Sequence, residues 1–328
     1  MKKEKLPQIS IVIPNFNGEK YIENCLDSLK EQSFNNLEII VIDDCSKDAS
    51  LEILNRYQEI RLLVNSDNSG FATSVNRGIK AAQGEYVLLL NNDVVVPENF
   101  VEKLYEAIAE DEKIFSVSSK MIRYYERDKI DDTGDFYNLL GWAYKRGDGK
   151  PVNRLMKRSQ VFSTCAGAGL YRKSVFEEIG LFDEHYFAYM EDVDVSYRGL
   201  IHGYKNYYEP EAKCFHIGSA TTADGNKYSA FKVKISARNN VYTAWKNMPL
   251  LQFVINLPFL ILGFLIKGTM FIVKGFGKEY WSGLLEGIRT LPKLSKTKFK
   301  IKHIGHYLKI EGMLLVNVFR YVGEKLSK

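Results

Sequence analysis

Short apolar runs alternate with segments of helical periodicity over the first 120 residues of the chain. Four of these runs are almost continuously apolar: residues 8–14, 37–42, 60–64 and 86–90. Such runs are typical of strands buried on both faces of a parallel sheet. Three segments between them carry apolar side chains at helical spacing: residues 19–32, 50–57 and 71–82. Strands that alternate with helices at short intervals predict a doubly wound α/β fold with a mostly parallel sheet.

Polar side chains follow directly where the predicted strands end. The run at residues 86–90 stops at Asn91, Asn92 and Asp93, and Asp44 follows the run at 37–42. Ligands of open α/β sheets bind beyond the carboxyl ends of the strands. Asn and Asp are also common in turns, so a purely structural role stays open for each residue alone.

Two common nucleotide-binding fingerprints are absent from the sequence. The first strand–loop–helix segment lacks G-x-G-x-x-G, which disfavours a dehydrogenase, and no G-x-x-x-x-G-K-[ST] occurs, which disfavours a P-loop nucleotidase. Carboxylates repel bare phosphate, so those at the strand ends must face a sugar, a base or a metal. The pattern therefore indicates a nucleotide bridged by a metal ion.

The second half of the predicted α/β region contains another acidic group. After a predicted helix at 97–110 and a strand at 114–119, residues 121–158 show little periodicity and are either substrate-facing or a solvated excursion. Glu191, Asp192 and Asp194 then begin a predicted helix at 192–202. The helix dipole accounts for one or two acidic residues there, and three beside aromatic residues favour a functional role.

Charge divides the chain into two parts. Up to Trp245 there are 31 basic and 36 acidic residues, and from Lys246 onward 14 basic and 4 acidic. A basic tail suits an anionic surface, and no nucleic-acid-binding module accompanies it. Four separated cysteines suggest reduced thiols, and the N-terminus lacks the apolar core of a signal peptide, so we expect a cytoplasmic protein.

The tail also contains an apolar segment, at residues 250–266. It has 17 residues and includes Gln252, Asn256 and Pro258, whereas a spanning helix needs about 20 apolar residues. The lysine-rich residues 293–302 would favour an anionic leaflet. We therefore expect an interfacial helical anchor, with a true integral membrane protein as the alternative.

Three motifs taken together identify a family. They are SIVIPNFNGEKYIENCLDSL, LEIIVIDDCSKDAS and NSGFATSVNRGIKAAQGEYVLLLNNDV. Over roughly residues 8–250 the chain resembles the family-two glycosyltransferases of the GT-A fold, and within them the rhamnosyltransferase-like branch. The resemblance implies a GT-A domain at residues 1–245, with a nucleotide-sugar half at about 1–120 and an acceptor half at about 121–245, followed by the helical tail at 246–328.

The resemblance also implies roles for individual residues. Asn91, Asn92 and Asp93 stand where the family has its D-x-D motif, so Asp93 carries most of the binding of Mn²⁺ or Mg²⁺, and Asn91 contacts the nucleotide sugar. The family's E-D motif falls on Glu191 and Asp192. The remaining implied roles are a base pocket lined by Pro14 and Phe16, a base or ribose hydrogen bond from Asp44, and a third metal ligand at His216.

The expected activity follows from these assignments. Asp192 would be the general base of an inverting transfer from a nucleoside-diphosphate sugar, with dTDP-rhamnose as the expected donor, and Glu191 would orient the acceptor. The acceptor would be a lipid-linked or cell-surface glycan at the cytoplasmic face of the cell membrane. A nonenzymatic sugar-nucleotide or glycan-binding subunit of a membrane complex is the alternative, which the intact acidic group disfavours.

Overall fold

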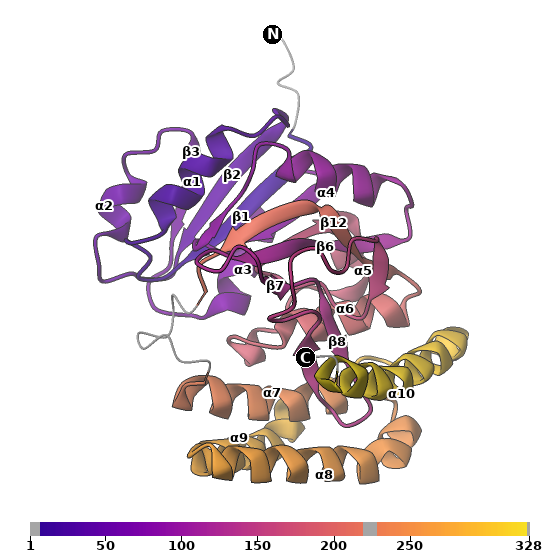
Figure 1. The fold of residues 1–328 in the computed structure, drawn as a ribbon. Coiled ribbons are helices and arrows are strands. Elements are labelled where there is room, and N and C mark those ends of the chain that lie inside the picture. Colours follow the sequence, from indigo (N-terminus) through magenta and orange to yellow (C-terminus); the bar gives the residue numbers. More distant parts are fainter. Residues whose placement is uncertain (1–6, 219–227, 327–328) are drawn as a thin grey trace.

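The computed structural model describes residues 7–218 and 228–326 (Figure 1). Its central sheet has the strand order β10-β12-β6-β11-β4-β1-β2-β3. Four parallel strands form one side of it: β1 (Ile9–Asn15), β2 (Leu37–Asp43), β3 (Ile60–Val64) and β4 (Tyr86–Leu90). The four apolar runs of the sequence are these four strands, so the predicted parallel sheet is confirmed.

The other side of the sheet is mixed. The strand β11 (Ala168–Arg172) runs antiparallel to both β4 and β6 (Ile114–Arg123). The long strand β12 (Lys205–His216) is parallel to β6 and antiparallel to the two-residue strand β5 (Val94–Val95). The β5–β12 pairing brings the residues after β4 next to the end of β12, although more than 100 positions separate them in sequence.

Helices cover both faces of the sheet because its strands alternate their side chains between two cores. Ile9, Ile11 and Ile13 point into one core, while Val12 points into the other. The first core is closed by α1 (Ile22–Lys30), α2 (Ser50–Leu54) and α4 (Phe100–Ala109). The second is closed by α3 (Phe71–Ala81), α5 (Lys173–Ile179) and α6 (Glu191–Ile201).

Residues 121–158, for which the sequence shows little periodicity, contain short strands. These strands and the one that follows are β7 (Ile130–Asp132), β8 (Asp135–Tyr137), β9 (Ala143–Lys145) and β10 (Ser159–Val161). Strand β7 pairs with β6 of the main sheet, and β8 pairs with β9. Strands of three residues are too short to show a period of two, which explains why these strands leave no signal in the sequence pattern.

The C-terminal region is helical. Its α-helices are α7 (Ala230–Asn247), α8 (Leu250–Val273), α9 (Gly277–Thr290) and α10 (Ile304–Leu326). Short 3₁₀ turns lie at Glu184–Tyr186, Leu291–Lys293 and Ile301–His303. In Figure 1, α8 and α9 lie at the bottom of the molecule, away from the parallel sheet. The boundary predicted after residue 245 falls in the last turn of α7.

The helix α8 is longer than the apolar segment from which it was predicted. It continues through Pro258 and Lys267 to Val273 as one helix of 24 residues. Among the described residues it is the one helix long and apolar enough to cross a membrane, by length and composition only. It touches the rest of the protein closely at Gly263, where an added Cβ would lie 2.1 Å from the carbonyl oxygen of Leu140.

Candidate active site

The carboxyl ends of β1 and β4 are joined by an amide network. The Asn92 side chain donates to Asn15 Oδ1 at 2.7 Å, and Asn15 in turn donates to Asp43 Oδ1 at 2.8 Å. Gly18 approaches this network so closely that an added Cβ would lie 2.1 Å from Asn15 Oδ1. The loop after β1 is thereby fixed against the turn after β4, which holds the Asn91–Asp93 motif in place.

The residues expected to bind the base lie on the loops around this network. Phe16 is 36% exposed at the start of the loop after β1, and Pro14 is half-buried just before it. The Asp44 carboxylate accepts hydrogen bonds from Asn65 Nδ2 at 2.7 Å and from the backbone N–H groups of Ser69 and Gly70 at 3.0 and 2.8 Å. Asp44 therefore ties the loop before α3 to β2, and its contact with a base or ribose stays a prediction.

The two predicted metal ligands lie side by side. Because Val94 pairs with His216 across β5 and β12, the Asp93 Oδ2 atom lies 3.4 Å from His216 Nε2. Asp93 is 5% exposed, and its carbonyl oxygen accepts a hydrogen bond from the N–H of Ile217 at 3.0 Å. The structure thus places together two residues that are 123 positions apart in the sequence.

His216 has a second carboxylate partner, which the sequence did not suggest. Its Nδ1 lies 2.8 Å from Oδ2 of Asp131 on β7, and that same oxygen lies 2.9 Å from Lys145 Nζ on β9. Burial alone would lower the pKa of His216, but Asp93 and Asp131 raise it to about 9. Burial opposes the ionised form of Asp131 as well, and Lys145 and His216 nevertheless hold its pKa well below the usual value.

Asp192, the expected general base, is linked to the Asn91–Asp93 turn through a short backbone segment. Its Oδ2 accepts the N–H of Ala166 at 3.4 Å, and the carbonyl of the next residue, Gly167, accepts the N–H of Asn91 at 2.9 Å. Two adjacent residues therefore connect Asp192 to Asn91. Burial raises the pKa of Asp192, against hydrogen bonds from the N–H groups of Ala166 and Val193.

The segment that presents Asp192 has an unusual backbone. Phe187, Tyr189 and Met190 all have positive φ angles, of 62°, 66° and 71°. Non-glycine residues pay about 1–2 kcal/mol each for this conformation. Asn239 of α7 stabilises it, because its Nδ2 lies 2.7–3.0 Å from the carbonyl oxygens of Tyr186, Ala188 and Tyr189. The strained turn into α6 is therefore held by a neighbouring helix, as is common at functional sites.

A further carboxylate pair lies beside Asp192. One oxygen each of Asp132 and Asp135 and the Cys165 sulfur lie within 4.8 Å of one another. Asp132 Oδ2 is buried without a hydrogen bond from the described residues, and Lys145 Nζ lies 3.9 Å away. Burial raises the pKa of Asp132 to about 7. The charge of Lys145 opposes this rise, and the charge of Asp131 adds to it. This group is a second place where a cation or a proton would be stabilised.

The three acidic residues at the start of α6 have different surroundings. Asp194 is fully buried, and although burial opposes its ionisation, Lys246 and Arg198 lower its pKa to about 2. It is therefore a structural residue, and the interpretation of all three as one functional group is too broad. Glu191 is buried with one oxygen unpaired among the described residues, and burial and Asp192 raise its pKa. Its contact with the acceptor stays a prediction.

Asp93 and His216 fit a divalent cation. Carboxylate oxygens and imidazole nitrogens bind such ions at about 2.0–2.2 Å, so two donor atoms 3.4 Å apart can both reach one ion. An oxygen and nitrogen set with no thiolate suits Mn²⁺ or Mg²⁺. When bound to a diphosphate, the ion supplies neutralisation of the charge that develops on it.

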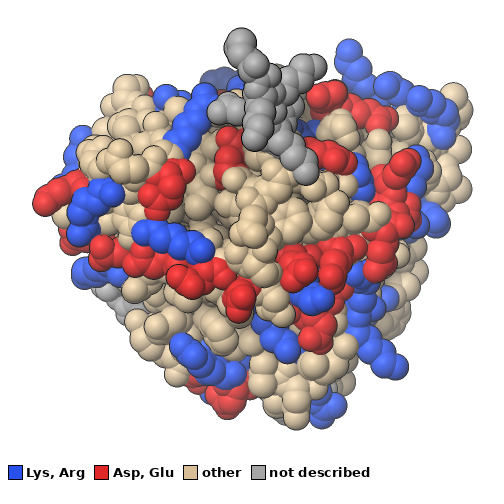
Figure 2. Space-filling view, turned by 90° about the horizontal axis from the view of Figure 1, so that it is seen from above, with Lys and Arg blue, Asp and Glu red and all other residues tan. Residues whose placement is uncertain are grey.

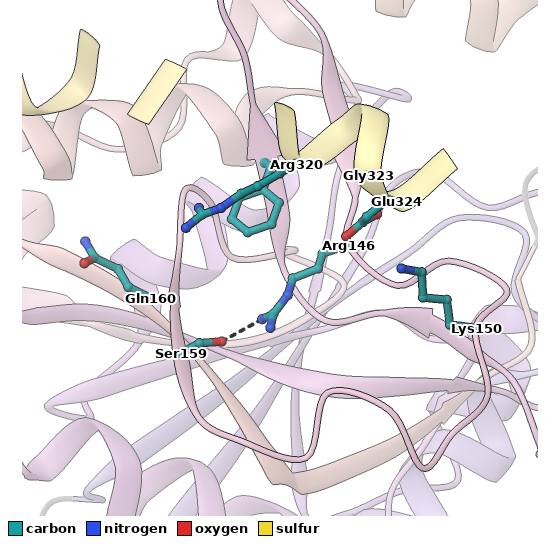
Figure 3. Close-up of a pocket in the computed structure, with 8 residues that line it drawn as sticks. Arg146, Lys150, Ser159, Gln160, Arg320, Gly323 and Glu324 are labelled. Atoms are coloured by element: carbon teal, nitrogen blue, oxygen red, sulfur yellow. Dashed lines mark hydrogen bonds between the residues drawn. The ribbon is translucent and has the colours of Figure 1, made fainter. Parts of the chain in front are cut away.

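A cavity of about 340 Å³ lies elsewhere, between residues 136–160 and α10 (Figure 3). Arg146 lies at its centre and donates to Ser159 Oγ at 2.7 Å, whereas its neighbour Lys145 reaches Asp131. Lys145, the last residue of β9, and Arg146, which follows it, therefore point to two different places, and the cavity of Figure 3 is separate from the carboxylate group around Asp192.

Comparison with known proteins defines the family of the chain. The family model "Glycosyl transferase family 2" matches residues 10–180, which is just over half of the 328 residues. The chain belongs to glycosyltransferase family 2. The expected family is thus confirmed, while the rhamnosyltransferase-like branch stays a prediction.

This transferase is similar to bacterial glycosyltransferases over part of their length. It is 35% identical to glycosyltransferase GlyG of Streptococcus pneumoniae over 39% of the chain, and 27% identical to the poly-beta-1,6-N-acetyl-D-glucosamine synthase of Staphylococcus aureus over 65%. It spans 42% of GlyG and 51% of the synthase. The chain therefore covers about half the length of these relatives or less.

Solved structures show that the transferase has the GT-A fold. S. aureus TarS 1-349 in complex with UDP-GlcNAc matches 87% of the chain and 82% of its own length, with a TM-score of 0.57 and 19% identity. GalNAc-T7 with UDP, GalNAc and Mn²⁺ matches 72% of the chain and 48% of its own length, with a TM-score of 0.58 and 19% identity. At such identities the likeness concerns the fold alone.

Proposed function

We propose that this transferase moves a sugar, with inversion at the anomeric carbon, from a nucleoside-diphosphate sugar to a hydroxyl of a lipid-linked or cell-surface glycan. The acceptor oxygen forms a bond to the anomeric carbon as the bond from that carbon to the diphosphate breaks. The hydroxyl proton passes to Asp192, and the nucleoside diphosphate leaves. Because the leaving group is already a weak base, a second protonating carboxylic acid is unnecessary, unlike in glycoside hydrolysis.

The observation that carries this proposal is the link from Asp192 to Asn91 through Ala166 and Gly167. The link supports the proposal because it connects a carboxylate of raised pKa to the Asn91–Asp93 motif, to which we assign the diphosphate. A base is most effective when its pKa approaches the working pH, so the burial that raises the pKa of Asp192 suits proton removal. Asp93 and His216 are the residues that would hold the cation at the same edge.

The experiment that tests this role is Asp192→Asn. We expect transfer to fall by about 10²–10⁴-fold while binding of the nucleotide sugar changes little. Asp128, an exposed acid between β6 and β7, gives the control Asp128→Asn, which should transfer at the normal rate. Substantial turnover by Asp192→Asn would remove Asp192 from the role of base, and binding without transfer by the unaltered protein would favour a binding subunit.

For the donor we propose dTDP-rhamnose as the first candidate, because the Asn91-Asn92-Asp93 form of the motif resembles the rhamnosyltransferase-like branch. Glu191 orients the acceptor, and Pro14, Phe16 and Asp44 bind the nucleoside. The S. aureus relative named for poly-beta-1,6-N-acetyl-D-glucosamine supports a cell-surface glycan as acceptor. A thermal-shift screen of nucleotide sugars with Mn²⁺ tests the donor, and stabilisation by a different sugar nucleotide would replace rhamnose.

We also propose that α8 and α10 bind an anionic bilayer from the cytoplasmic side. Most of the large apolar side chains exposed on the described surface belong to residues 250–326, and 17% of the most apolar 18 residues of α8 are buried. Exposed apolar surface of this extent is typical of interaction sites. The helical tail as a whole, residues 246–328, has ten more basic than acidic residues. In contrast, the opposite end of the molecule has a band of acidic side chains among the basic ones (Figure 2).

Vesicle flotation tests this membrane proposal. The triple variant Leu251→Ser, Ile255→Ser and Leu262→Ser removes exposed apolar side chains of α8 and should release the protein from phosphatidylglycerol vesicles. Tyr125→Ser, which removes an exposed aromatic ring far along the chain from the tail, should leave binding intact. If the unaltered protein does not bind vesicles but self-associates, and the triple variant abolishes that self-association, the exposed apolar face of α8 would instead bind a second copy of the chain.

A further inference from the structure

His216 is held by its two ring nitrogens between two carboxylates. Nδ1 lies 2.8 Å from Asp131 Oδ2, and Nε2 lies 3.4 Å from Asp93 Oδ2. A neutral imidazole has one N–H, so the nitrogen that carries it cannot bind a cation. A group that accepts a hydrogen bond from Nδ1–H therefore leaves Nε2 as the unprotonated nitrogen, and Nε2 is the nitrogen that faces Asp93.

The backbone around His216 is already fixed on both sides, which leaves the ring angle to be set. Its carbonyl accepts the N–H of Tyr124 at 2.9 Å, and the next residue, Ile217, donates to the carbonyl of Asp93 at 3.0 Å. These bonds fix where the Cα lies and leave the side-chain torsions free. Among the described residues that contact the ring, Asp131 supplies the short hydrogen bond that stops its rotation.

Asp131 is itself held in place. Its Oδ2 lies 2.9 Å from Lys145 Nζ, and β7, on which it lies, pairs with β6 beside β12. One carboxylate oxygen thus accepts from both an imidazole and an ammonium group. A divalent cation bound directly to that oxygen would lie close to the Lys145 charge, which Coulomb repulsion disfavours.

We infer that Asp131 is a positioning residue for the divalent cation: it accepts the Nδ1–H of His216, so that Nε2 is directed at the ion shared with Asp93, and Lys145 holds Asp131. This inference rests on the proposed function only for the presence of the cation. Outer partners of this kind fix the orientation of ligating histidines in metal sites, and removing one costs about 10–100-fold in metal affinity. Residues 121–158 thereby acquire a role at the site.

The test measures binding of Mn²⁺ alone, by electron paramagnetic resonance of the free ion, through the millimolar range. We expect Asp131→Ala to weaken binding about 10–100-fold. Asp131→Asn keeps an oxygen that can accept from Nδ1, so its loss should be smaller. Asp128→Asn, in the same segment but exposed, should bind like the unaltered protein. The melting temperature of each variant establishes that it is folded.

A double-mutant cycle with His216→Ala separates positioning from direct binding. If Asp131 acts through His216, then Asp131→Ala should change Mn²⁺ affinity by no more than about twofold when His216 is already absent. An equal loss in both backgrounds, an unchanged affinity in Asp131→Ala, or no Mn²⁺ binding by the unaltered protein would overturn the inference. Failure of the transfer reaction alone would not, because the cycle reads the ion without a sugar donor.

Discussion

Two buried groups of charged side chains meet at the first turn of α6, and they differ in how their charges are balanced. Asp194 lies 2.9 Å from Arg198 Nη2 and 3.2 Å from Lys246 Nζ, so its charge is compensated. Asp192, two residues earlier, has neighbouring carboxylates at Asp132 and Asp135, with Lys145 as the nearby cation. The same helix thus carries one carboxylate whose pKa falls on folding and one whose pKa rises.

This difference shows how a structural carboxylate can be told from a functional one. Burying a charge is costly, and a stable protein offsets that cost with partners of opposite charge. Where carboxylates gather without enough cations, the missing charge is left for a ligand, a metal ion or a proton to supply. The surplus around Asp192 is what a site for a cation-bound diphosphate and an acceptor hydroxyl requires.

The largest expected effect comes from neutralising the compensated carboxylate. Asp194→Asn should lower the free energy of unfolding by about 3–5 kcal/mol, because Arg198 and Lys246 stay buried without it. The matched change Asp192→Asn should leave that free energy nearly the same and lower transfer by about 10²–10⁴-fold instead. Urea denaturation of both variants measures the two free energies of unfolding. A similar loss of stability in the two variants would show that the two carboxylates do not differ in this way.

The pH dependence of this loss has a defined sign. The pKa of Asp194 falls from its ordinary value of 3.8 to about 2 on folding, so its stabilisation is complete above about pH 4. It is lost as the pH falls through about 2. The stability difference between the unaltered protein and Asp194→Asn should therefore shrink across that acid range, and a difference that grows toward low pH would contradict the assignment.

The parallel sheet could be predicted from the sequence, because local pattern determines it. The run at residues 86–90 is apolar throughout and is buried throughout as β4. Asp93, His216 and Asp192 came from ordered motifs that resemble the family. The acids at 131, 132 and 135 carried a signal too, as three carboxylates within five residues around Gly134, but no local pattern says what they face.

What could not be predicted depends on contacts between distant segments. Asp131 reaches His216 through the pairing of β7 with β6, and β7 belongs to a segment without periodicity. The apolar segment predicted at residues 250–266 is shorter than α8, because Lys267 interrupts the apolar run in the sequence but not the helix. Lys267 Nζ instead lies 5.6 Å from the ring centroid of Trp142, a distance that permits a cation–π contact.

An intermediate effect should follow from releasing the turn that presents Asp192. Asn239→Ala removes the amide that donates to the carbonyls of Tyr186, Ala188 and Tyr189, at an expected cost of about 2 kcal/mol in unfolding free energy. Because Met190 precedes α6 in a left-handed conformation, kcat should fall more than the KM of the donor changes. Asn240→Ala is the control, because its Nδ2 bonds within α7 to the carbonyl of Ser236. Equal kcat and KM values in the two variants would show that the turn before α6 does not contribute to catalysis.

The smallest expected effect is a gain in stability on the uncompensated side. The pKa of Asp132 is about 7 in the folded protein and 3.8 ordinarily, so its ionisation costs stability progressively as the pH rises between those values, and fully above pH 7. Asp132→Asn should therefore raise the free energy of unfolding at pH 8 by about 1 kcal/mol, with little change near pH 4. Thermal unfolding in the presence of EDTA measures this gain without divalent cations. A loss of stability at pH 8 would mean that Lys145, 3.9 Å away, already compensates the charge of Asp132. The charges around Asp192 would then be balanced more nearly as those around Asp194 are.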